Sequence, residues 1–243
     1  MFKDKTSNPA FTLSSWETHT SEKQQMTEGG AFSKTILLFF VMMTTFLLTT
    51  KYFIEMESKG FGVIGNVLLC LITLGIVIFT CTKPKLSPIL APIYASLEGV
   101  FLGQLVLLSE YILEALIVTT TIFFTFLVLY RTRIIRVSNW FIKITFGLTL
   151  GVLVFYLIEM SLILLNITDG SLVFGNGIIS LIVAAFCLFV AVSNLLVDFW
   201  MIEDGSERGL AKYMEFYFAM SLLISIVWIY VEVLRILKIL NND

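Results

Sequence analysis

Charged residues are scarce in this chain, and their scarcity defines its class. Of the 243 residues, 14% are charged and 58% are hydrophobic, and the mean hydropathy is +0.93. A soluble domain has about a quarter of its residues charged, so this composition excludes a water-soluble fold. We therefore expect an integral membrane protein in contact with the lipid bilayer.

Histidine and cysteine are also rare. The single histidine, His19, cannot supply a zinc site or any other site that needs several imidazoles. Cys70, Cys81 and Cys187 are odd in number and far apart, which favours neither a disulfide framework nor a redox or metal motif. Walker and dinucleotide-binding loops are missing, as is a basic patch for nucleic acid. We expect no enzymatic activity, no cofactor and no nucleic-acid partner.

Long apolar blocks are what the sequence does contain. A helix needs about 20 apolar residues to cross the hydrocarbon core of a bilayer. Seven such blocks predict an all-α integral membrane protein, a seven-transmembrane-helix bundle. The blocks cover 33–54, 61–81, 87–108, 113–130, 140–165, 178–201 and 213–237. The sixth block could begin at Leu172 if its helix tolerates the glycines that follow.

Three segments follow from these blocks: a polar N-terminal tail over 1–32, a membrane domain over 33–238 and a short C-terminal tail over 239–243. The N-terminal tail mixes Ser, Thr, Lys and Glu without periodicity, so we expect it to be flexible or to lie on the membrane surface.

The distribution of Lys and Arg predicts the orientation. Twelve of the 16 Lys and Arg residues lie in the N-terminal tail, in the connections after the second, fourth and sixth spans, or just inside the spans that follow these segments. The other four are Lys51, Lys59, Arg235 and Lys238. Because basic residues favour the cytoplasmic side, we expect the N-terminus in the cytoplasm and the C-terminus outside. An even number of spans, with one apolar block outside the bilayer, is the minor alternative.

Ionisable side chains inside the spans are costly and therefore suggest function. Here they are nearly all acidic. Glu98 lies near the middle of the third span, whereas Asp198 and Glu215 lie at the inner ends of the sixth and seventh spans. Glu159 and Glu232 lie toward the outer ends of the fifth and seventh spans.

Asp198 and Glu215 are a candidate pair. If the connection over 202–212 is centred near Glu207, the antiparallel helices place Asp198 level with Glu215 or Phe216. Two adjacent buried carboxylates cannot both ionise cheaply, so such a pair could hold a proton or a calcium ion and act as a pH-sensitive latch. Alternatively, both carboxylates lie at the headgroup boundary beside a solvated acidic loop.

The other carboxylates have competing interpretations. Glu232 precedes Arg235 by three residues, so a local ion pair competes with a role in an ion pathway. Gly99 and Gly103 form a GxxxG spacing that permits close helix approach, which would bury Glu98 against protein. Glu159 is the weakest candidate because it could extend outward past Asn166 and Asp169.

Four stretches carry a family resemblance. They are SNPAF at 7–11, PKLSPILAPIYASLEGVFLG at 84–103, YRTRIIRV at 130–137, and a final block that includes LVDFWMIEDGSERGLAKYMEFY at 196–217 and VWIYVEVLRIL at 227–237. On these residues the chain resembles the Bax inhibitor family, also called YccA-like or transmembrane Bax inhibitor motif proteins, and most closely its bacterial branch.

The resemblance implies a seven-helix bundle with a central last helix, and a pH-sensitive calcium leak that is gated by an acidic pair on the last two helices. Asp198 matches the first member of that pair. The second acid of the pair would fall near Leu223, which has no carboxylate. Similarity of the IYVE motif to the family's last acidic motif favours Glu232 as the second acid, whereas the depth of the hairpin favours Glu215. A bacterial plasma membrane is the implied location.

Three functions remain open at this stage. The first is a passive, pH-sensitive cation leak with calcium as the permeant ion. The second is a membrane scaffold or stress regulator that conducts nothing. The third is a proton-coupled carrier for a small solute.

Overall fold

Seven long helices dominate the computed structural model, which describes residues 25–55, 61–105, 111–168, 170, 175 and 177–241. Within these residues, seven helices are long and apolar enough to cross a membrane. The seven-transmembrane-helix prediction is therefore confirmed. The helices are α1 (Glu28–Glu55), α2 (Gly62–Thr82), α3 (Ser87–Leu105), α4 (Ile112–Arg131), α5 (Asn139–Leu164), α7 (Ile178–Glu207) and α8 (Met214–Leu240), with a short 3-10 helix η4 (Pro84–Leu86) before α3.

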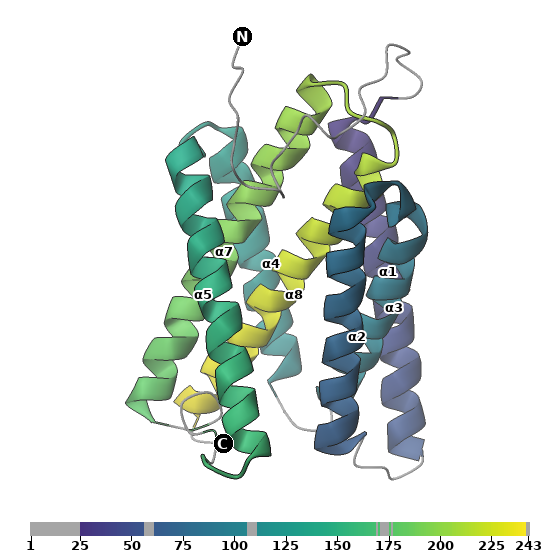
Figure 1. Cartoon of the computed structure of the whole chain (residues 1–243). Coiled ribbons are helices and arrows are strands. Elements are labelled where there is room, and N and C mark those ends of the chain that lie inside the picture. Colours follow the sequence, from purple (N-terminus) through teal and green to yellow (C-terminus); the bar gives the residue numbers. More distant parts are fainter. Residues whose placement is uncertain are drawn as a thin grey trace. The chain divides into compact units, whose positions relative to one another are not determined.

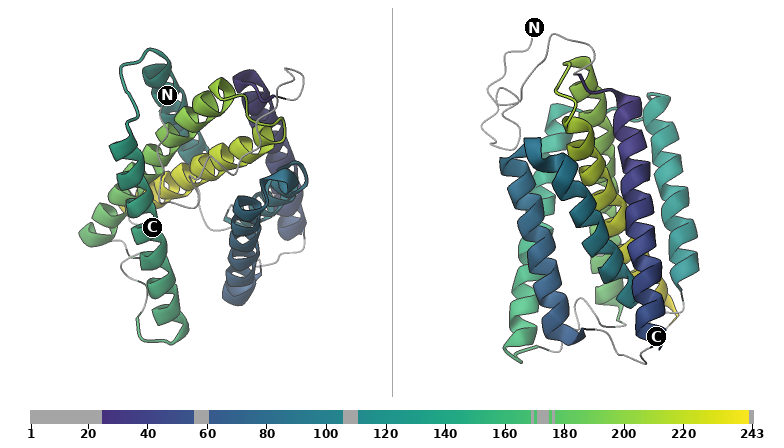
Figure 2. Two further views of the ribbon diagram at one scale, coloured as in Figure 1. Left: turned by 45° about the horizontal axis from the view of Figure 1, so that its top comes forward. Right: turned by 90° about the vertical axis from the view of Figure 1, so that its right-hand side faces the viewer.

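The chain folds into two compact units, of which the first comprises residues 1–108 and 201–223. In this unit α3 packs against both α1 and α2 (Figures 1 and 2). Gly99 and Gly103 make the contact with α1 close, as the GxxxG spacing predicts. A methyl group at Gly99 would overlap Oγ1 of Thr45 and the carbonyl of Met42. Thr50 Oγ1 also donates to the Gly103 carbonyl at 3.3 Å.

The second unit comprises residues 109–200 and 224–243, so it contains α4, α5, most of α7 and the last part of α8. Figure 1 shows α5 alongside α7 within this unit. An Asn194 to Thr149 hydrogen bond of 2.7 Å joins the two helices. Because α8 begins in one unit and ends in the other, it contributes to the core of both; half of its apolar window is buried, the largest share among the seven spans.

Many large apolar side chains point away from the protein. Ile64 on α2 and Leu113 on α4 are 74% and 69% exposed, and Phe40 on α1 is 64% exposed. In a chain with seven membrane-spanning helices, these side chains contact lipid.

Two helix ends differ from the predicted spans by five residues or more. α1 begins at Glu28, five residues early, because Thr27 accepts a 2.9 Å hydrogen bond from the Gly30 amide and caps the first turn. α7 continues to Glu207, where the sequence suggested an acidic loop. A 2.7 Å ion pair between Asp204 and Arg208, one turn apart, stabilises this polar end. The alternative start of this span at Leu172 falls outside the described residues; α7 itself begins at Ile178.

Candidate functional site

Asp198 is buried in α7 and is bound by a hydroxyl group from the last helix. Its side chain is only 6% exposed, and its Oδ2 accepts a hydrogen bond of 2.5 Å from Ser225 Oγ on α8. Ser225 is itself 4% exposed. A carboxylate away from water needs such donors, because an unpaired buried charge is very costly.

The hairpin between α7 and α8 has a different centre from the predicted one. α7 ends at Glu207 and α8 begins at Met214, so the connection is centred near Leu210 and not near Glu207. Because α7 continues six residues beyond its predicted end, the residue of α8 expected opposite Asp198 is no longer Glu215 but Leu223, two residues before Ser225. Leu223 is the position at which the resemblance expects the second acid. Here it is fully buried, and the hydroxyl two residues later contacts Asp198.

Glu215 belongs to the first turn of α8, and its side chain contacts the N-terminus of α1. Its Oε1 accepts hydrogen bonds from the Thr27 amide at 3.1 Å and from Thr27 Oγ1 at 3.3 Å, and Lys212 Nζ lies 3.2 Å away. The carboxylate is 1% exposed, and a methyl group at Gly30 would overlap it. A negative charge here complements the helix dipole, so Glu215 has a clear structural role as a cap.

The predicted pairing of Asp198 with Glu215 stays a prediction, as does calcium at the pair. Asp198 belongs to one compact unit and Glu215 to the other. Within α8, Ser225 lies ten residues after Glu215, a rise of about 15 Å. In the part of the chain that the structure describes, no group of three or more His, Cys, Asp or Glu residues could hold a metal ion.

Glu232 lies in a buried polar cluster in the second unit. Its Oε1 accepts from Tyr156 Oη at 2.5 Å and from Trp228 Nε1 at 3.2 Å, and its Oε2 lies 3.1 Å from Arg235 Nη1. Arg235 Nη1 also donates to Tyr156 Oη at 2.6 Å. The local ion pair with Arg235, one of the two readings of the sequence, is thus present. Tyr156 ties it to α5.

Arg235 makes this cluster costly. Its Nε and Nη2 atoms are buried and have no hydrogen-bond partner among the described residues, although its side chain is 13% exposed overall. Unmade hydrogen bonds of a buried donor cost about 1–3 kcal/mol each. Tyr156 also packs against the cluster that contains Cys187 of α7. Three helices therefore meet at Glu232.

The other two candidates have less polar surroundings. Glu98 is half-buried on α3, where its side chain is hydrogen-bonded to Tyr94 one turn earlier. The close packing of α3 on α1 is present at Gly99 and Gly103, whereas the burial of Glu98 by that packing stays a prediction. Glu159 is 5% exposed, one turn after Tyr156 on α5. It therefore does not extend outward to solvent past Asn166; Asp169 lies outside the described residues.

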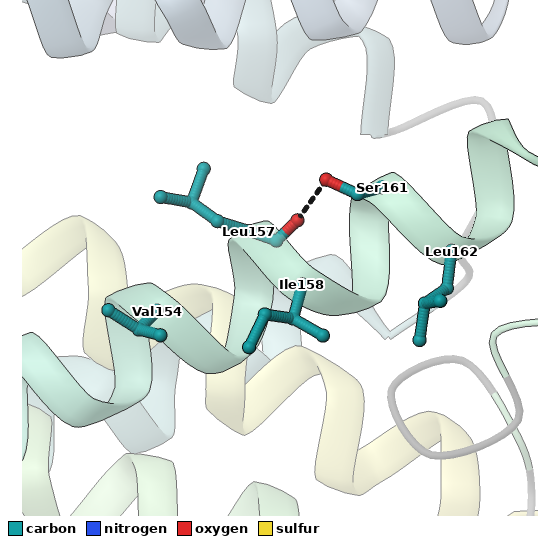
Figure 3. Close-up of a pocket in the computed structure, with 5 residues that line it drawn as sticks. All are labelled: Val154, Leu157, Ile158, Ser161 and Leu162. Atoms are coloured by element: carbon teal, nitrogen blue, oxygen red, sulfur yellow. Dashed lines mark hydrogen bonds between the residues drawn. The ribbon is translucent and has the colours of Figure 1, made fainter.

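A surface hollow on α5 is lined almost entirely by apolar side chains. It has a volume of about 270 Å³ and is lined by Val154, Leu157, Ile158, Ser161 and Leu162 (Figure 3). Its hydroxyl group, that of Ser161, donates to the Leu157 carbonyl of the same helix at 2.7 Å. The hollow therefore suits an acyl chain better than an ion.

Sequence reasoning missed Ser225, Tyr156 and Trp228, each of which donates a hydrogen bond to a buried carboxylate. Trp228 could have been found, because it lies one helical turn before Glu232. Ser225 and Tyr156 act across helices, and no local signal identifies them.

Comparisons with known proteins agree with this architecture. The chain matches the family described as Bax inhibitor 1 like over residues 8–242, nearly its whole length. Searches of curated proteins and of solved structures gave no match. A family match over so much of the chain, together with seven membrane-spanning helices, means that this protein is a member of the Bax inhibitor 1 like family.

Proposed function

We propose that the protein is a pH-sensitive passive cation leak with calcium as its permeant ion. The observation that carries the proposal is Asp198, a carboxylate that is 6% exposed within a membrane-spanning helix and is hydrogen-bonded to Ser225. A buried carboxylate can exchange a proton for a cation, which makes ion passage depend on pH.

The position of Glu232 supports the same proposal. It provides a second buried carboxylate in the same unit, seven residues after Ser225 on α8 and thus about 10.5 Å along the helix. Acidic side chains line the pores of cation channels, and Arg235 lies 3.1 Å from Glu232, so this ion pair must separate before Glu232 can contact a cation. Catalysis has no part in this proposal. We further propose that the protein resides in a bacterial plasma membrane, with the N-terminus in the cytoplasm.

The test is ion flux through liposomes that contain the purified protein. Vesicles loaded with Ca²⁺, Mg²⁺, Na⁺ or K⁺ are compared with protein-free vesicles between about pH 5 and about pH 8. We expect calcium efflux above that of the protein-free vesicles, with a rate that varies with pH. Saturation and counterflow would instead indicate the proton-coupled carrier.

A non-conducting scaffold or stress regulator is the second candidate, and the N-terminal segment favours it. Met26 is 2% exposed, and its amide donates to the Leu210 carbonyl at 2.7 Å, so residues 25–27 dock on the α7–α8 connection. A partner that binds the tail could act on α8 through this contact. Deletion of residues 1–24 distinguishes the two, because a scaffold loses its phenotype whereas a leak keeps its flux.

A further inference from the structure

Three helices of the second unit carry the same series of side chains. On each of α5, α7 and α8, two polar residues are seven residues apart, which is two turns or about 10.5 Å, and an apolar residue lies between them. Residues seven apart share a helix face, so each series lines one stripe. The hydrogen bonds of the unit bring the three stripes together.

One end of this stack surrounds Asp198. There Asn194 Nδ2 of α7 donates to Thr149 Oγ1 of α5 at 2.7 Å, and one turn further along α7, Asp198 accepts from Ser225 of α8. Hydroxyl, amide and carboxylate groups thus come from three helices. We refer to these four residues as the Asp198 end.

The other end surrounds Glu232. Tyr156 of α5 donates to Glu232 of α8 and accepts from Arg235 of α8, and it packs against the cluster that contains Cys187 of α7. We refer to these four residues as the Glu232 end. Two polar clusters, each around a buried carboxylate, therefore occupy the same three helices, two turns apart.

The middle of the stack is apolar. Val152 of α5 is 5% exposed and Val190 of α7 is fully buried, and both belong to one packed cluster that Trp228 of α8 contacts. The same cluster contains Cys187 and is contacted by Tyr156, and the Trp228 indole also donates to Glu232, so the apolar layer directly borders the Glu232 end. A tightly packed apolar layer excludes water and ions, because neither can be hydrated there.

We propose that Val152, Val190 and Trp228 form the closed gate of a route between the Asp198 end and the Glu232 end. The inference rests on the proposed cation leak, for which it names the barrier. Apolar constrictions close channels by dewetting. A gate of this kind opens when α5, α7 and α8 separate slightly, and a hydroxyl group placed in the layer favours its hydration.

The test uses Cys187 as a native probe, because it lies beside the layer and is 1% exposed. Cys70 and Cys81 are replaced by alanine, which leaves Cys187 as the single thiol. A positively charged methanethiosulfonate reagent then reports whether water reaches Cys187. The variants are Val190→Thr and Val152→Thr, which keep the shape of valine and add a hydroxyl group. The matched control is Val154→Thr on the 52% exposed surface of α5.

We expect Val190→Thr and Val152→Thr to raise the modification rate of Cys187 about tenfold or more, and to raise calcium efflux in the same vesicles. Val154→Thr should change neither. If both layer variants are folded, as shown by cooperative thermal unfolding, and Cys187 is modified at the wild-type rate, the gate is wrong. If the wild-type protein still releases calcium in that experiment, the proposed cation leak is kept and only the gate is rejected. If Cys187 is modified faster but no variant conducts cations, the proposed leak is wrong, whereas the conclusion that the apolar layer excludes water is kept.

Discussion

Ser225 Oγ donates a hydrogen bond of 2.5 Å to Asp198 Oδ2, and this bond joins the last two membrane-spanning helices at a depth where neither residue is exposed by more than 6%. The family resemblance places a second acid near this position, at Leu223. In this chain a hydroxyl group provides the contact instead.

Ser225→Ala should destabilise the protein, because Asp198 then loses a donor that water cannot replace. We expect a loss of about 1–3 kcal/mol in the free energy of unfolding, visible as a lower thermal midpoint in detergent. Ser193→Ala is the control: Ser193 is equally buried but donates to the Phe189 carbonyl of its own helix. Equal midpoints for the two variants would contradict the role of Ser225.

Gly99→Ala should disrupt the contact between α3 and α1, since the added methyl group overlaps Thr45 and the Met42 carbonyl. Overpacking of this kind costs about 1–3 kcal/mol. Gly151→Ala on α5 is the matched control, because a methyl group there meets nothing within 4 Å. Alanine favours a helix over glycine, so the control should be neutral or slightly stabilising. A Gly99→Ala protein as stable as the control would rule out close packing at this position.

The part that the sequence predicted well is the part that depends on local composition. Seven apolar blocks identified seven helices because only a helix satisfies its own backbone in lipid. The ends were less accurate, since Thr27 caps a helix α1 that begins at Glu28, and an ion pair of Asp204 with Arg208 stabilises an α7 that continues to Glu207. The level of Asp198 then shifted, because hairpin depth depends on those ends.

The candidate site was predictable in its acids but not in its donors. Asp198 and Glu232 could be identified because a carboxylate inside an apolar block is rare. Ser225 and Tyr156 are common residue types in such blocks. They matter only because helix packing places them beside a carboxylate, and helix packing cannot be obtained from one sequence.

Glu215→Gln should loosen the N-terminal segment, because the neutral side chain no longer pairs with Lys212 and caps α1 less well. We expect a loss of about 0.5–2 kcal/mol and faster proteolysis near residues 25–30. Hydrogen exchange at the Thr27 amide gives the direct readout. Glu114→Gln, at the exposed first turn of α4, should leave both unchanged. Should Thr27 exchange as slowly as in the wild type, Glu215 is not the cap.

Arg235→Met should lower the free energy of unfolding more than the double variant in which Arg235→Met is combined with Glu232→Gln. Alone, it leaves Glu232 buried without its cation, which costs about 3–5 kcal/mol. Combined with Glu232→Gln, the loss should be smaller, because no buried charge remains. Thermal unfolding of the two single variants and the double variant forms the cycle. Strictly additive losses would show that the 3.1 Å contact contributes no coupling.

In the proposed cation leak, Asp198 makes cation passage depend on pH. Its most direct test is calcium efflux from proteoliposomes between about pH 5 and about pH 8 for the wild type, Asp198→Asn and Asp204→Asn. Asp204 is the matched control, because it lies on the same helix and is paired with Arg208. We predict that the wild type and Asp204→Asn share a pH-dependent efflux, whereas efflux through Asp198→Asn no longer varies with pH. A pH profile of Asp198→Asn that matches the wild type would show that Asp198 does not make calcium efflux depend on pH.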